Sequence, residues 1–125
     1  MSQLVVIIGA SDKPHRYANM AMHSLIEHGH DVYLVNPFKS DIENTPCYSS
    51  IADIVGAIAD EIDTVTLYVN PNRFQDHIDE VIKARPKRII MNPGTEDAAL
   101  EKRLSEAGIN VLRACTLVML NTGQF

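Results

Sequence analysis

An apolar strand that runs into a glycine turn and then a helix is the feature that most constrains the fold of this chain. Residues 4–8 are entirely apolar, and Gly9-Ala10-Ser11 follows them directly. Apolar residues then recur at helical spacing over residues 17–28. A strand of this kind, followed by a glycine turn and a helix, is how a parallel α/β domain with a nucleotide site begins. The start of the chain therefore predicts an α/β fold.

The alternation of strands and helices continues to the end of the chain. Four segments with apolar residues at helical spacing separate five runs rich in β-branched residues. These five predicted strands are residues 4–8, 32–35, 64–68, 87–91 and 110–113. No linker, repeat or low-complexity segment interrupts them. Residues 1–125 are therefore predicted to form one domain, a three-layer Rossmann-like fold whose five parallel strands have the order 3-2-1-4-5.

Composition argues against several classes of function. The net charge is −5 at pH 7, so no overall basic field is expected to attract nucleic acid. No apolar run approaches the roughly 18 residues of a membrane helix, and a strand directly after Gln3 leaves no cleavable leader. Cys47 and Cys115 match no metal or redox spacing and fit free thiols in a reducing compartment. We expect a cytoplasmic protein with no metal site, no membrane contact and no nucleic-acid partner.

The turn after the first strand lacks most of the dinucleotide fingerprint. The G-x-G-x-x-G motif needs three glycines, and this turn supplies only Gly9. The second strand leads into Asn36-Pro37-Phe38-Lys39, which places a cation where NAD-binding proteins hold the ribose with an acid. We therefore expect a nucleotide other than NAD. The alternative is an oxidoreductase-type NAD(P) domain in which Lys39 contacts a 2′-phosphate.

The loops after the strands form the candidate site, because ligands of such sheets bind at the carboxyl ends of the strands. Gly9 allows the backbone to approach a phosphate, and the helix that follows directs its N-terminal amides toward the same place. Ser11 offers a hydroxyl and Arg16 a bidentate fork. The alternatives are that Ser11 only caps the turn and that Arg16 and Lys39 are solvated surface cations.

Three successive strands end in Asn-Pro, at Asn36-Pro37, Asn70-Pro71 and Asn92-Pro93. Proline stops a strand and restricts the residue before it to extended geometry. Each asparagine amide is then available to bridge neighbouring loops or to contact a ligand. The alternative is that each pair only shapes a turn.

Together these residues resemble the CoA-binding domain family, the Rossmann-like unit also found in the alpha subunit of succinyl-CoA synthetase. The resemblance covers nearly the whole chain. The residues that carry it are Val5-Val6-Ile7-Ile8-Gly9-Ala10-Ser11, Arg16, Leu25-Ile26-Glu27-His28-Gly29-His30, Val35-Asn36-Pro37 with Lys39, and Cys47-Tyr48-Ser49-Ser50-Ile51-Ala52-Asp53-Ile54.

This resemblance implies a CoA or acyl-CoA ligand. Its diphosphate would lie on the first loop, its adenosine across the ends of strands two and three, and its 3′-phosphate near Lys39. The expected ligand contacts are Gly9, Ala10, Ser11, Arg16, Asn36, Pro37, Lys39, Tyr68, Val69, Asn70, Pro93 and Gly94.

No residue pattern in the chain predicts a catalytic group. None of the five histidines lies in a catalytic motif, and Cys115 is either a reactive thiol near the site or a small buried hydrophobe. We therefore expect a protein that binds CoA without catalysis of its own, as a carrier, a sensor or a subunit of an acyl-CoA enzyme. The apolar residues 116–125 are expected to fold back as a final turn or helix. The alternative is a homodimer patch on an interaction module with a vestigial nucleotide pocket.

Overall fold

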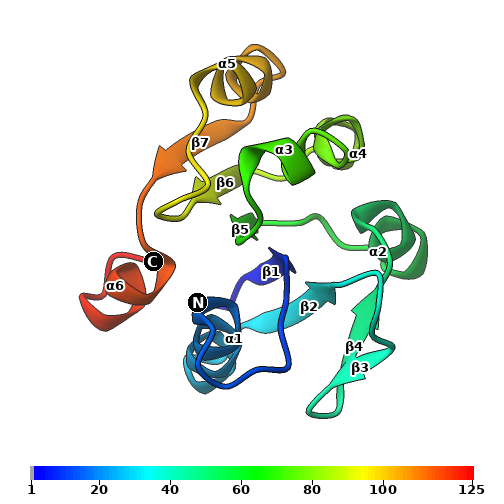
Figure 1. Ribbon diagram of the computed structural model, residues 1–125, viewed down its shortest axis with the longest axis vertical. Coiled ribbons are helices and arrows are strands. Elements are labelled where there is room, and N and C mark those ends of the chain that lie inside the picture. Colours follow the sequence, from blue (N-terminus) through cyan, green and yellow to red (C-terminus); the bar gives the residue numbers. More distant parts are fainter. Residues whose placement is uncertain (1) are drawn as a thin grey trace.

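The computed structural model describes residues 2–125, which form one α/β unit around a seven-stranded sheet (Figure 1). The sheet order is β3-β4-β2-β1-β5-β6-β7, and β3 is the one strand that pairs antiparallel to its neighbour. The strands are β1 (Leu4–Ile8), β2 (Asp31–Val35), β3 (Asp41–Ile42), β4 (Thr45–Tyr48), β5 (Thr64–Leu67), β6 (Arg88–Met91) and β7 (Asn110–Arg113).

Helices cover both faces of this sheet, as the apolar first strand predicts. In Figure 1, α1 and α6 lie on one side, and α2 to α5 lie on the other. Alternate residues of β1 supply the two cores: Val5 and Ile7 pack toward α1, whereas Val6 and Ile8 pack toward α2, α4 and α5. The helices are α1 (Tyr17–Glu27), α2 (Ile51–Ala57), α3 (Pro71–Phe74), α4 (Ile78–Ala84), α5 (Ala98–Glu106) and α6 (Thr116–Asn121).

The α/β class and the Rossmann-like architecture are confirmed, but the predicted five-stranded parallel sheet with order 3-2-1-4-5 is wrong. The third predicted strand, β5, was expected beside β2, but it pairs with β1. The place beyond β2 belongs to β4, in register Leu34 with Cys47. The sequence reading missed β4 because it is short and contains Pro46, a residue that weakens a strand prediction. The parallel strands have the order β4-β2-β1-β5-β6-β7, so the direction in which successive strands are added to the sheet reverses at β1.

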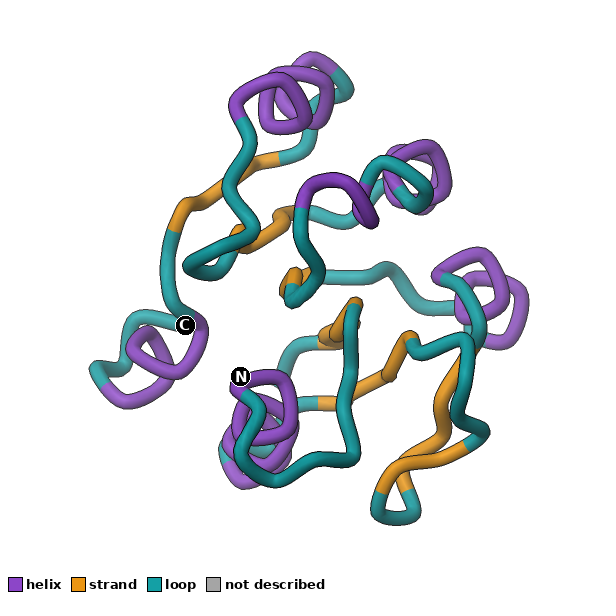
Figure 2. Tube along the Cα trace, viewed as in Figure 1, coloured by secondary structure: helices purple, strands orange, loops and turns teal. Residues whose placement is uncertain are grey.

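A tight hairpin joins β3 to β4 at the edge of the sheet (Figure 2). Its turn residues, Glu43 and Asn44, both have positive φ, at 48° and 67°, as a two-residue type I′ turn requires. The Glu43 carboxylate accepts a hydrogen bond from Asn19 Nδ2 at 3.0 Å and lies 3.0 Å from His23 Nε2. Because Asn19 and His23 belong to α1, the hairpin tip is fastened to the helix that follows the first loop.

The end of the chain folds back on the domain, as predicted, with α6 packed beside α1. Met119 and Leu120 are buried within the same chain, and Val118 remains 54% exposed. A homodimer through this segment remains a prediction. None of the described helices is long and apolar enough to cross a membrane.

The link between α6 and the sheet is a buried asparagine. Asn92, which follows β6, donates from Nδ2 to Thr66 Oγ1 at 2.7 Å and to the Leu67 carbonyl at 2.9 Å. Its Oδ1 accepts the Thr116 N–H at 2.9 Å. The Thr116 hydroxyl in turn lies 2.8 Å from that of Thr66. This amide therefore ties β5, β6 and the start of α6 together in the interior.

Removing the side-chain amide of Asn92 should destabilise the fold far more than removing that of Asn70, the asparagine of the Asn-Pro pair after β5. Asn92→Ala removes three buried hydrogen bonds and leaves the Leu67 carbonyl and the Thr116 N–H without this partner. We therefore expect it to lower the free energy of unfolding by about 3 kcal/mol. The exposed side chain of Asn70 accepts the Arg73 N–H as the cap of α3, so Asn70→Ala should cost about 1 kcal/mol. Urea unfolding of the two variants measures this difference, and equal losses would contradict the proposed link.

Candidate functional site

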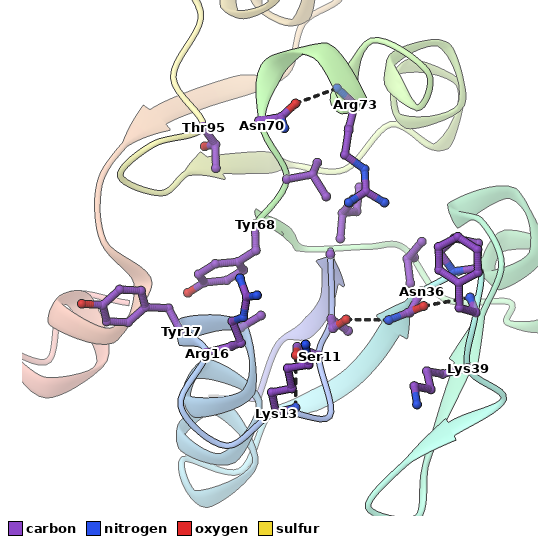
Figure 3. Close-up of a pocket in the computed structure, with 18 of the residues that line it drawn as sticks. Ser11, Lys13, Arg16, Tyr17, Asn36, Lys39, Tyr68, Asn70, Arg73 and Thr95 are labelled. Carbon is purple, nitrogen blue, oxygen red and sulfur yellow. Dashed lines mark hydrogen bonds between the residues drawn. The ribbon is translucent and has the colours of Figure 1, made fainter.

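A cavity of about 540 Å³ opens at the carboxyl ends of the central strands. Its walls come from the loops after β1, β2, β5 and β6 and from the first turn of α1, which is the edge where α/β sheets bind ligands (Figure 3). The tertiary structure brings all twelve residues expected from the sequence to this one cavity. They are Gly9, Ala10, Ser11, Arg16, Asn36, Pro37, Lys39, Tyr68, Val69, Asn70, Pro93 and Gly94.

Gly9 forms the floor of the cavity, where β1 turns toward α1. Its φ is +90°, and a Cβ at this position would lie 2.8 Å from the Tyr68 carbonyl oxygen and 2.8 Å from Val69 Cγ1. The N–H groups of Gly9 and Ala10 both donate to the Val35 carbonyl at 3.2 Å. Glycine is thus required here by the close approach of neighbouring strands. Both N–H groups therefore already have an acceptor within the chain. Their contact with a phosphate remains a prediction.

The first turn of α1 opens toward the cavity without a capping side chain. Arg16 is the N-cap in extended conformation, and the first turn of α1 contains no acidic residue. The Ser11 hydroxyl accepts the Lys13 N–H at 3.1 Å, so it caps the turn, which is the alternative reading of this residue. The helix is eleven residues long, and the positive end of its dipole is left for an anion.

Cations outnumber acidic side chains in the lining of the cavity although the chain as a whole is acidic. Lys13, Arg16, Lys39 and Arg73 all line it, together with one carboxylate, Asp12. Within the described residues, Lys13, Arg16 and Arg73 form no ion pair with an acidic side chain. Figure 3 shows Arg73 extending from α3 into the cavity. This concentration of positive charge fits a ligand with several anionic groups.

Lys39 pairs with Asp12 across the mouth of the cavity, with Nζ and Oδ2 2.9 Å apart. The hydrogen bond from Lys39 holds the pKa of Asp12 below its ordinary value, and the same bond raises the pKa of Lys39. Both groups therefore stay charged at neutral pH. Both are about half exposed, at 43% and 48%, so a ligand phosphate has access to Lys39 by replacing Asp12.

The three asparagines of the Asn-Pro pairs all hold loops in place. Asn36 bridges two of the loops, because its Nδ2 donates to the Ala10 carbonyl and its Oδ1 accepts the Phe38 N–H, both at 2.8 Å (Figure 3). Asn70 caps α3, and Asn92 is the buried link to α6. Bridging of neighbouring loops is confirmed for Asn36. The cap at Asn70 fits the alternative that the pair shapes a turn, and ligand contact remains a prediction.

Tyr68 lines the cavity with a partly buried side chain. Burial raises the pKa of its hydroxyl to about 12. The hydroxyl oxygen is enclosed and forms no hydrogen bond within the described residues. Cys115, the candidate reactive thiol, is not among the residues that line the cavity, and it is a partly buried free thiol at the N-cap of α6.

Ten further residues of the lining were not among the twelve expected contacts: Ile8, Asp12, Lys13, Tyr17, Ala18, Val35, Phe38, Arg73, His77 and Thr95. The strand pattern had already placed Phe38 and Arg73 at this edge, Phe38 after β2 and Arg73 after β5, where the structure forms α3. His77 lies between α3 and α4, and no sequence pattern placed it near the first loop.

Comparison with known proteins identifies a family. The model of the CoA binding domain matches residues 3–121. No curated protein matches the chain. A crystal structure of an uncharacterized protein shares 35% identity over 100% of this chain and 99% of its own, with a TM-score of 0.86.

Two further solved structures show the same fold. A hypothetical protein from Pyrococcus horikoshii OT3 is 32% identical, and the match covers 97% of this chain and 83% of that protein, with a TM-score of 0.87. An acetyl-coenzyme A synthetase from Ca. Korarchaeum cryptofilum, solved with phosphate and ADP, is 23% identical, with a TM-score of 0.73. The match covers 90% of this chain but 25% of that enzyme, and at this identity it shows the fold alone.

A methyl group at Gly9 should cost more stability than one at Gly94, although both have φ near +90°. Gly94 has open space around it, so Gly94→Ala carries only backbone strain, about 1 kcal/mol. Gly9→Ala adds the clash with the Tyr68 carbonyl, and we expect a loss of about 3 kcal/mol. Urea unfolding of both variants measures the difference. A Gly9→Ala variant as stable as Gly94→Ala would show that the strand junction is not tightly packed.

Proposed function

The chain belongs to the CoA binding domain family, and from this premise we propose that it binds coenzyme A or an acyl-CoA in the cavity at the edge of the sheet. One observation carries the proposal. The uncapped first turn of α1 and four cationic side chains line the same cavity of a protein whose net charge is −5. CoA carries a diphosphate and a 3′-phosphate, and anions of this kind bind at helix N-termini and to arginine.

The ligand would lie across the cavity from α1 to the loop after β2. We place the diphosphate at Ser11, Arg16 and the first turn of α1. The adenosine would lie along Asn36, Pro37 and Lys39, with Tyr68, Val69 and Asn70 as the wall for its base. The pantetheine would run toward Pro93 and Gly94 after β6. The lining of one cavity by all of these residues supports this path.

The 3′-phosphate would take the place of Asp12 beside Lys39. The exposure of the ion pair supports this exchange, because neither partner is held in the interior. A phosphate carries more negative charge than a carboxylate and accepts more hydrogen bonds. Asp12 is therefore a competitor that a ligand without a 3′-phosphate would leave in position.

We propose that the protein has no catalytic activity alone and acts as a carrier, a sensor or a subunit of an acyl-CoA enzyme. Cys47 and Cys115 are free thiols, which supports a reducing compartment such as the cytoplasm. Cys115 does not line the cavity, so a role toward the ligand thiol is not part of this proposal.

Calorimetric titration of the ligand-stripped protein with CoA, acetyl-CoA, NAD and NADP tests the proposal directly. We expect micromolar binding of CoA or acetyl-CoA and no heat of binding from NAD or NADP. Binding of NADP without CoA would mean that Lys39 contacts a 2′-phosphate and that the protein is an oxidoreductase-type domain. A protein that binds none of the four, but dimerises with concentration, would favour an interaction module.

Reversal of the charge at Lys39 should weaken CoA binding much more than binding of 3′-dephospho-CoA. Lys39→Glu removes the cation that would hold the 3′-phosphate and adds a repulsive carboxylate, so we expect at least a tenfold loss, about 1.4 kcal/mol, for CoA alone. Lys83→Glu is the matched control, since it makes the same change in net charge at an exposed position of α4 outside the cavity. Equal losses for the two ligands would remove Lys39 from the site.

A further inference from the structure

Phe38 is the most exposed large apolar side chain in the described part of the chain, at 83%. The other two phenylalanines are covered: Phe74 is buried, and Phe125 packs against His30 and Arg88. Phe38 instead lines the cavity. When a ligand covers an exposed phenyl ring that lines a cavity, the burial of apolar surface stabilises the complex.

The backbone around Phe38 is built to hold the ring at this place. Asn36 Oδ1 accepts the Phe38 N–H at 2.8 Å, and Asn36 Nδ2 donates to the Ala10 carbonyl at 2.8 Å. The Lys39 N–H donates to the Asn36 carbonyl at 3.4 Å. The ring of Pro37, which lies between these residues, fixes its own φ. Phe38 is thus displayed by a turn that is anchored to the first loop.

The chemistry of the cavity assigns a different part of the ligand to each of its two sides. Arg16 and the open first turn of α1 offer positive charge on one side, and Asn36 with the loop that carries Phe38 lies on the other (Figure 3). A phenyl ring offers no hydrogen bond, so it distinguishes a ligand group only by shape and by its π-face. The planar base is the part of a nucleotide that gains most from such a surface.

Tyr17 is the other exposed aromatic side chain of the cavity, at 69%. It belongs to the first turn of α1 and follows Arg16, so it lies at the end where the phosphates are expected. Figure 3 shows Tyr17 and Asn36 on opposite sides of the cavity. The diphosphate is placed at the α1 end, and the base must lie away from it, on the side of Lys39, where the 3′-phosphate is placed. This favours Phe38 over Tyr17 as the partner of the base.

We propose that Phe38 is the platform on which one face of the adenine base stacks, while Tyr68, Val69 and Asn70 form the wall beside it. This inference rests on the proposed function and adds to it a residue that determines specificity. Because the contact is made with the face of the base, ligand fragments that contain adenine depend on Phe38, and fragments without adenine do not.

The chain contains no tryptophan, so Phe38→Trp introduces a single fluorophore at the proposed platform. We expect CoA and adenosine 3′,5′-bisphosphate to quench its emission, and 4′-phosphopantetheine to leave it unchanged. Val118→Trp is the matched control, because Val118 is 54% exposed on α6 and does not line the cavity. Its emission should respond to none of the three ligands.

Calorimetry of Phe38→Ala gives the second measurement. Stacking on an aromatic side chain is worth enough that its loss should weaken CoA binding about tenfold. Binding of 4′-phosphopantetheine should be unchanged, because that fragment lacks the base. Val118→Ala should bind both ligands as the unmodified chain does.

Several outcomes would overturn the platform while leaving the proposed function intact. These are CoA binding by Phe38→Ala at full affinity, equal losses for CoA and 4′-phosphopantetheine, or a dependence on adenine that Tyr17→Ala removes and Phe38→Ala does not. If the unmodified chain binds no CoA, the proposed function fails first. Titration of Phe38→Trp with NADP then decides the platform separately, since quenching supports an adenine platform and an unchanged emission overturns it.

Discussion

The junction at the end of β1 is the constraint on which the rest of the structure depends. There the Val35 carbonyl accepts hydrogen bonds from both Gly9 and Ala10, and the Tyr68 carbonyl comes so close to Gly9 that a side chain has no room. Three neighbouring strands thus end at one level. Because the loops after β1, β2 and β5 all begin at this junction, their side chains meet in one cavity.

The electrostatics of the cavity follow from this arrangement and not from the composition of the chain. A protein of net charge −5 presents four cations at the one edge where a helix also begins without a cap. Asp12 offsets one of these cations through its ion pair with Lys39. Asn36 bridges two of the loops, and Glu43 fastens the β3–β4 hairpin to α1. A site held in this way has less conformational entropy to lose when a ligand binds.

Much of the fold could be predicted from the sequence, because the signals that specify it are local. The apolar run of β1 indicates burial on both faces, and glycines mark the helix ends. The strand order could not be predicted in the same way. The short β4 has no apolar pattern of its own and contains Pro46, and it belongs to the sheet because β2 offers it an unpaired edge. Once β4 was missed, β5 was assigned to its place.

For the candidate site, the sequence by itself determined the edge of the sheet and the residue types, because a strand pattern places every loop at one end or the other. Only the tertiary structure decided how those residues are used. Ser11 caps its own turn, Asn92 ties α6 to the interior, and Lys39 pairs with Asp12. The tertiary structure also brought His77 to the cavity. Hydrogen bonds and ion pairs between distant residues depend on distances of a few ångströms, and such distances exist only after the chain has folded.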